Sequence, residues 1–109
     1  MSAPKKGDLI YINFSPQAGH EQAGRRPAIV VSPENFNQVT GFVAVCPITN
    51  TTRGWGYELP IPSGLAFSGV ILTDQVKTFD WRARRTEIKG EATEVLLKDC
   101  IKMIHTYIS

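Results

Sequence analysis

Short apolar runs separated by glycine and proline limit what this chain can fold into more than any other feature of its sequence. The runs are rich in β-branched and aromatic residues, which predicts strands rather than helices. We expect strands over residues 7–14, 28–31, 42–48 and 57–61, one running from 70 toward 77, and a last one over 81–88. Because these strands are not separated by the helices that a parallel sheet requires, an antiparallel sheet is expected.

Two segments favour helices. Ser32 is a candidate N-cap and Pro33 suits the first helical position of a short helix that would end near Thr40. After Thr93, a second N-cap candidate, apolar residues recur at helical spacing on one face: Leu97, Ile101, Ile104 and Ile108. The sequence therefore predicts one domain over residues 1–109, mainly β with a C-terminal helix, as a small and strongly bent antiparallel barrel.

Composition and charge exclude several classes of protein. A hydrophobic content of 42% and a net charge of +2 fit a globular domain, and the charge alone does not imply a nucleic-acid partner. No apolar run approaches the ~20 residues that span a membrane, and a secretory signal is absent, so we expect a cytoplasmic protein without membrane contact. Cys46 and Cys100 lie far apart in apolar segments without clustered histidines, which predicts neither a disulfide nor a metal site.

The polar stretch over residues 19–27 places Glu21, Arg25 and Arg26, together with His20, between two apolar runs. One interpretation is an exposed charged hairpin with a local ion pair. The other is an anion site, because a guanidinium keeps its charge and its planar fork of donors matches phosphate oxygens. His20 is the one imidazole in this stretch, so a role as general base is conceivable, although nothing in the sequence orients its ring.

Thr49 stands where an apolar strand becomes polar, and its hydroxyl could donate to a phosphate if the strand ends beside the arginines. As an alternative, it is an ordinary β-branched or turn residue.

The densest positive cluster consists of Lys77, Arg82, Arg84 and Arg85 around Trp81, and strand alternation would place Arg82 and Arg84 on one face. A solvated edge strand explains it as well as a nucleic-acid groove does. Trp55, in a glycine-flanked loop beside Arg53, favours the groove, and stacking on its ring would require the free bases of a single strand.

Read together, these residues resemble the MazF/PemK family of toxin endoribonucleases over nearly the whole chain. The motif Glu-Gln-x-Gly-x-Arg-Pro at residues 21–27 is specific, and further matches follow it: Ser32-Pro33, Pro47-x-Thr49, Asp74-Gln75-Val76-Lys77 and Trp81-Arg82-Ala83-Arg84.

The resemblance implies an SH3-like β-barrel, a homodimer, and cleavage of single-stranded RNA at a short preferred sequence without a metal or other cofactor. It also implies a cognate antitoxin, a small protein whose acidic tail blocks the RNA groove. The family's catalytic arginine and threonine fall on Arg26 and Thr49, with Glu21 as an accessory group. Its RNA-groove positions fall on Gln75, Lys77 and Arg84, and the loop residues Arg53 and Trp55 are further candidates for RNA binding.

The hypothesis is an mRNA-cleaving toxin whose reaction passes through attack of the ribose 2′-OH. His20, where many relatives carry serine, and Trp55 are departures that could alter which bases are preferred. A rival from another class is a CcdB-like toxin of the same barrel fold, which poisons DNA gyrase without catalysing a reaction. A catalytically inactive RNA-binding module would show the same sequence if the loop were misaligned by one residue.

Overall fold

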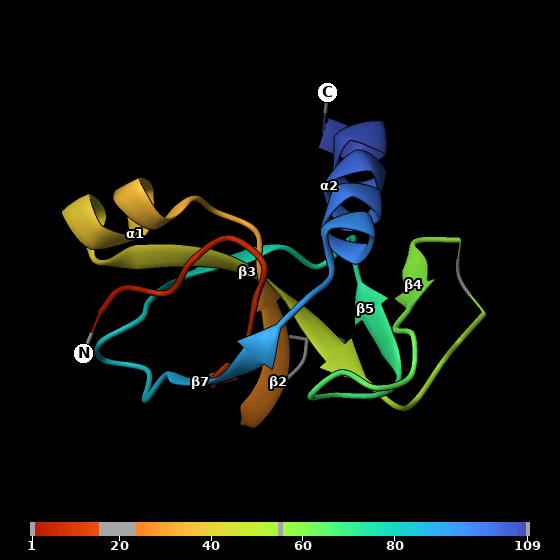
Figure 1. Ribbon diagram of the computed structural model, residues 1–109, viewed down its shortest axis with the longest axis horizontal. Coiled ribbons are helices and arrows are strands. Elements are labelled where there is room, and N and C mark those ends of the chain that lie inside the picture. The colour runs from red at the N-terminus through yellow and green to blue at the C-terminus, as the bar shows by residue number, and fades with distance from the viewer. Residues whose placement is uncertain (1, 16–23, 55, 109) are drawn as a thin grey trace.

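The computed structural model describes residues 2–15, 24–54 and 56–108, which form seven strands and two helices (Figure 1). The strands are β1 (Asp8–Asn13), β2 (Arg25–Val30), β3 (Phe42–Thr49), β4 (Glu58–Pro60), β5 (Val70–Leu72), β6 (Lys77–Asp80) and β7 (Glu87–Glu91). The helices are α1 (Glu34–Thr40) and α2 (Glu94–Ile108). Within the described residues, neither helix is long and apolar enough to cross a membrane.

All pairings in the sheet are antiparallel, in the order β4-β5-β3-β2-β1-β7, with β6 also paired to β3. β3 is the central strand, because β2 lies along one of its edges while β6 and then β5 share the other. The mainly β class with a C-terminal helix is thus confirmed, although among the described residues β4 and β7, the two end strands, do not pair to close the sheet.

Two apolar clusters lie on opposite faces of the first two strands. One contains Ile10, Ile12, Ala28 and Val30, and it extends to Trp81. The other contains Leu9 and Ile29 and packs against the buried face of α2, formed by Leu96, Cys100 and Ile104. Figure 1 shows α2 standing over the sheet, with α1 and β4 on opposite sides of it. We call the face that carries the first cluster the Ile12 face, and the face that carries the second cluster the α2 face.

The predicted helices are present, and one cap differs. Thr93 caps α2 as expected, since its Oγ1 accepts a hydrogen bond from the Leu96 amide at 3.1 Å. Ser32 is not the cap of α1, because Pro33 occupies that position without a side-chain hydrogen bond. The Ser32 hydroxyl instead donates to Asn37 Oδ1 at 2.5 Å and accepts from the Ala44 amide at 2.8 Å, which ties α1 to β3.

Two predictions about strands were wrong. The run from residue 70 toward 77 is two strands, β5 and β6, with a turn between them. Residues 81–85 form a turn rather than a strand, so Arg82 and Arg84 do not alternate along a sheet. Trp81 misleads because its apolar ring is only 1% exposed, yet it enters the core from a turn, where its indole nitrogen donates to the Asn37 carbonyl at 2.8 Å.

Pro47 lies inside β3, where it pairs with Ala28. The Ala44 carbonyl accepts a hydrogen bond from the Val31 amide, on the β2 side of β3. Because the backbone polar groups of successive residues point to alternate edges of a strand, the nitrogen of Pro47 points to the opposite edge. On that edge, pairing with β6 stops at Val45 and pairing with β5 starts at Ile48. Proline therefore falls in a gap of the ladder, where its missing N–H costs no hydrogen bond.

Candidate active site

The two adjacent arginines lie in the first two positions of β2, not in the loop before it, and they point to opposite faces of the sheet. Arg26 pairs with Ile12, and Arg25 pairs with Asn13. Cross-strand partners share a face, so Arg26 belongs to the Ile12 face and Arg25 to the α2 face. The two guanidinium groups therefore cannot act as one anion site.

Arg25 has a structural role. Its guanidinium donates to Glu87 Oε1 at 2.7 Å and to the Arg85 carbonyl at 2.5 Å, and it lies 5.2 Å from the centre of the Tyr11 ring. The hydrogen bond and charge of Lys89, followed by those of Arg25, lower the pKa of the Glu87 carboxyl below its ordinary value. Arg25 thereby ties β2 to β7 and to the turn before it.

Arg26 has an exposed side chain at the edge of the Ile12 face. Its position relative to Thr49 follows from the register of β2 and β3, in which Ala28 pairs with Pro47. Arg26 and Thr49 each lie two residues beyond this pair on their own strands, so alternation puts both side chains on the same face as Ala28 and Pro47. The structure thus directs a guanidinium and a hydroxyl toward the same side of neighbouring strands.

The hydroxyl of Thr49 is half-buried and oriented by its own turn. Oγ1 accepts a hydrogen bond from the Thr51 amide at 3.1 Å, which leaves the hydroxyl hydrogen for an acceptor on a ligand.

Gly69 packs directly against Thr49. A Cβ at this glycine would lie 2.2 Å from the Thr49 carbonyl oxygen, and its φ of +106° lies in a region that favours glycine. Thr49 is therefore fixed from both its side chain and its backbone.

Lys77 and Arg84 lie on the Ile12 face as well. Lys77 pairs with the buried Val45 across β3 and β6. The guanidinium of Arg84 lies 4.7 Å from the centre of the Phe79 ring and donates to the carbonyls of Asn13, at 3.3 Å, and Ser15. Arg84 is thereby held at the end of β1, close in sequence to Ile12, which pairs with Arg26 on β2. Four of the sequence-predicted residues, Arg26, Thr49, Lys77 and Arg84, share this face.

Not all predicted residues join this group. Gln75 is half-buried in the segment before β6, and its backbone amide donates to the Leu72 carbonyl at 3.1 Å. Arg53 is exposed in the loop after Thr49, where its amide donates to Glu58 Oε2 at 2.9 Å. Glu21 and Trp55, like His20, lie outside the described residues.

Glu58 is the residue that sequence reasoning missed. Its carboxylate accepts hydrogen bonds from the hydroxyl of Thr52 and from the amides of Arg53 and Gly54, at 2.9 and 3.1 Å. A lone acid at the start of β4, after a loop of threonine and glycine, was the available signal. Glu58 shapes the loop that follows Thr49.

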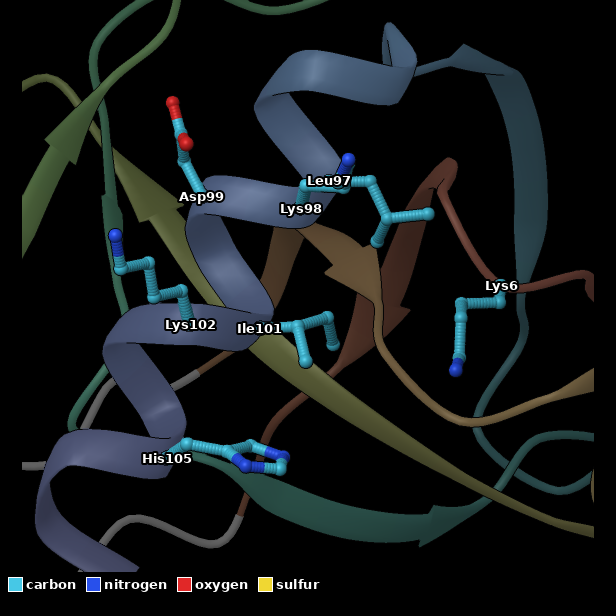
Figure 2. Close-up of a pocket in the computed structure, with 7 residues that line it drawn as sticks. All are labelled: Lys6, Leu97, Lys98, Asp99, Ile101, Lys102 and His105. Atoms are coloured by element: carbon cyan, nitrogen blue, oxygen red, sulfur yellow. The ribbon is translucent and has the colours of Figure 1, made fainter.

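The other chemically interesting groups lie elsewhere. Contact with Cys100, together with burial, raises the pKa of the Cys46 thiol, which makes it inert as a nucleophile. Among the described residues no three metal-ligating side chains gather into one group. A pocket of about 650 Å³ lies along α2 beside Lys6, with Leu97, Ile101 and His105 pointing toward it (Figure 2). It contains none of the predicted site residues.

The chain is similar to known proteins in both sequence and fold. The family model described as "PemK-like, MazF-like toxin of type II toxin-antitoxin system" matches residues 5–108. The chain is 46% identical over 87 residues to the endoribonuclease toxin MazF of Escherichia coli K12, covering 80% of this chain and 78% of that protein. MazF from Deinococcus radiodurans superimposes with a TM-score of 0.92 at 42% identity, covering 97% and 96% of the two chains. A MazE-MazF structure from the same organism gives 0.87 at 35% identity, over 100% and 98%.

The contact between Gly69 and Thr49 predicts a specific loss of stability. Gly69→Ala should lower the free energy of unfolding by at least about 3 kcal/mol, because the new methyl group meets the Thr49 carbonyl as well as an unfavourable φ. Gly64→Ala is the matched control, since Gly64 has a φ of +94° but open space around it, and it should cost about 1–2 kcal/mol. Urea denaturation measures both values. Equal losses would show that Thr49 is not held by this contact.

Proposed function

This chain belongs to the family of PemK-like, MazF-like toxins of type II toxin-antitoxin systems, and we propose that it cleaves single-stranded RNA at a preferred sequence without a metal. The curated relatives named MazF, PemK and ChpB are endoribonucleases, at 30–46% identity, which supports the same activity for this chain. The observation that best supports the proposal is the register of β2 and β3, from which alternation puts Arg26 and Thr49 on one face of the sheet.

The reaction we propose is an internal transesterification. The ribose 2′-oxygen attacks the adjacent phosphorus and loses its proton, the bond from phosphorus to the 5′-oxygen breaks, and that oxygen gains a proton. The products are a 2′,3′-cyclic phosphate and a 5′-OH. Negative charge builds on the nonbridging oxygens during this in-line displacement. A guanidinium and a hydroxyl already held by the protein can stabilise that charge without reorganising.

Arg26 acts in this scheme through its charge rather than as a base. Guanidinium groups stay protonated in proteins, so they accept protons poorly, whereas their donors match two oxygens of one phosphate. Thr49 supplies a hydrogen-bond donor to the same group, because its oxygen already accepts from Thr51. Glu21, in the same motif as Arg26, is proposed as the accessory catalytic group.

Substrate binding is assigned to the surroundings of this pair. Lys77 and Arg84 contribute positive charge on the Ile12 face, and we assign Gln75, in the segment before β6, to RNA binding as well. Arg53 and Trp55 belong to the loop whose amides Glu58 holds. Because this loop directly follows Thr49, we propose that it selects the bases next to the scissile bond. Positive charge with an aromatic side chain favours single-stranded RNA.

Two protein partners are part of the proposal. The MazE-MazF structures of Deinococcus radiodurans support an antitoxin partner, and we propose that its acidic tail covers the RNA groove. We also propose a homodimer, for which the exposed apolar group of Tyr57, Tyr107 and Ile108 provides a surface. Tyr57 and Tyr107 meet edge to face, with ring centres 5.5 Å apart. The cytoplasm, where RNA substrates are present, is the expected location.

The rival function, a gyrase poison with the same fold, leaves the central geometry unexplained. A protein that only binds another protein has no need of a guanidinium and a hydroxyl together on one face of the sheet. The named relatives of this chain with at least 30% identity are endoribonucleases as well.

Because Arg25 and Arg26 lie on opposite faces of the sheet, substituting each of them by alanine should have different effects on activity. Arg26→Ala should lower the rate of RNA cleavage by about 10²–10³-fold, because it removes a stabilising donor of the transition state. Arg25→Ala should retain most activity, since the contacts it removes, with Glu87, the Arg85 carbonyl and the Tyr11 ring, are structural. Single-turnover cleavage of labelled RNA measures both rates, and circular dichroism checks the fold. Comparable losses in the two variants would contradict the assignment.

The proposed chemistry also predicts a requirement in the substrate. Replacing the 2′-OH by hydrogen at the scissile nucleotide alone should abolish cleavage there, because the attacking group is gone, while binding of the oligonucleotide remains. An otherwise identical oligonucleotide with the replacement two nucleotides away is the control and should be cut. Cleavage at the deoxy position would rule out attack by the ribose hydroxyl.

A further inference from the structure

The turn between β6 and β7 contains two arginines that the proposed reaction does not use. The side chains of Arg82 and Arg85 are exposed, and within the part of the chain that the structure describes neither forms an ion pair. Together with Trp81 and Thr86 they line a pocket of about 350 Å³. Two guanidinium groups at one pocket require an explanation, because like charges repel each other unless an anion lies between them.

The backbone of this turn is held in an unfavourable conformation. Arg85 has a φ of +56°, and it is the one residue other than glycine with a positive φ among the described residues. Glycine would occupy this left-handed region without strain. The Arg85 carbonyl accepts the hydrogen bond from Arg25, so the strained residue is fixed next to the start of β2. Strain at an exposed charged residue points to a function of its side chain.

The chemistry of the pocket identifies the ligand class. Arg82 lies over the Trp81 ring at 4.8 Å, and that ring is only 1% exposed, so no base can stack there. The Thr86 hydroxyl donates to the Trp81 carbonyl at 2.6 Å and is not available. The groups left to meet a ligand are the two guanidinium groups, whose donors match phosphate oxygens.

The one carboxylate of this turn is already engaged. Asp80 Oδ1 accepts hydrogen bonds from the amides of Arg82 and Ala83, both at 3.0 Å. Asp80 therefore shapes the turn that presents the arginines, and its charge is partly satisfied by those amides.

Arg84 connects this pocket to the active site. It lies between the two arginines in sequence, yet its guanidinium packs on Phe79 and binds the carbonyls at the end of β1. One turn thus directs Arg84 to the Ile12 face, while Arg82 and Arg85 line the pocket with Trp81 and Thr86. We propose that Arg82 and Arg85 form a second phosphate subsite, which binds the RNA backbone beyond the scissile nucleotides. This inference rests on the proposed function.

The test uses the strain at Arg85 to separate binding from folding. Arg85→Gly should leave the melting temperature unchanged or raise it, because glycine relieves the positive φ. The same variant should bind a fully 2′-O-methylated RNA, which cannot be cut, about fivefold more weakly at 0.1 M salt. The slope of log affinity against log salt should fall by about 0.7, the value for one lost phosphate contact on a single strand. Fluorescence anisotropy measures both quantities.

Arg82→Gln is the second variant and should show the same loss of affinity and slope. Lys98→Gln, on α2, removes one positive charge that lines a different pocket and serves as the matched control. The inference is overturned if neither arginine variant differs from Lys98→Gln in affinity or slope while the wild-type protein cuts RNA. If the wild-type protein neither cuts RNA nor binds the probe, the proposed function itself fails and the subsite with it.

Discussion

β2 and β3 pair through three residues, Ala28, Ile29 and Val30, and this short ladder decides which side chains meet at the active site. Ile29 must enter the core beneath α2, while Ala28 and Val30 enter the opposite core. Because side chains alternate along a strand, a slip of one residue would exchange the two faces and move Ile29 out of the core beneath α2. The burial of these three residues therefore fixes Arg26 on the same face as Thr49. In this way hydrophobic packing sets the geometry of a polar site.

Within the part of the chain that the structure describes, neutral groups hold Arg84 and Thr49 in place at this site. Arg84 is fixed by backbone carbonyls and an aromatic ring, and Thr49 is fixed by the amide of Thr51 and by close contact with Gly69. Such groups keep their charge or donor capacity for a ligand, and their geometry exists before the ligand arrives. Arg25 shows the contrast, since its pairing with Glu87 uses the guanidinium for structure.

The sequence locates the strands and helices well, but it does not show to which face of the sheet a side chain belongs. Apolar runs and caps locate β1, β3 and α2, because each depends on residues close in sequence. The opposite roles of Arg25 and Arg26 depend on strand register, which involves β1 and β3 and cannot be read from the motif. Trp81 suggests a strand because it is apolar, yet it packs from a turn. The left-handed Arg85 and the loop-shaping Glu58 carry no sequence signal strong enough to be noticed.

The central claim is that Arg26 and Thr49 support attack of the ribose 2′-OH without a metal. Its most direct test is to incubate the purified protein with single-stranded RNA in the presence of EDTA and to determine the chemistry of both new ends. We predict undiminished cleavage that leaves a 2′,3′-cyclic phosphate on one fragment and a 5′-OH on the other. Loss of cleavage in EDTA, or fragments with a 5′-phosphate, would contradict this account.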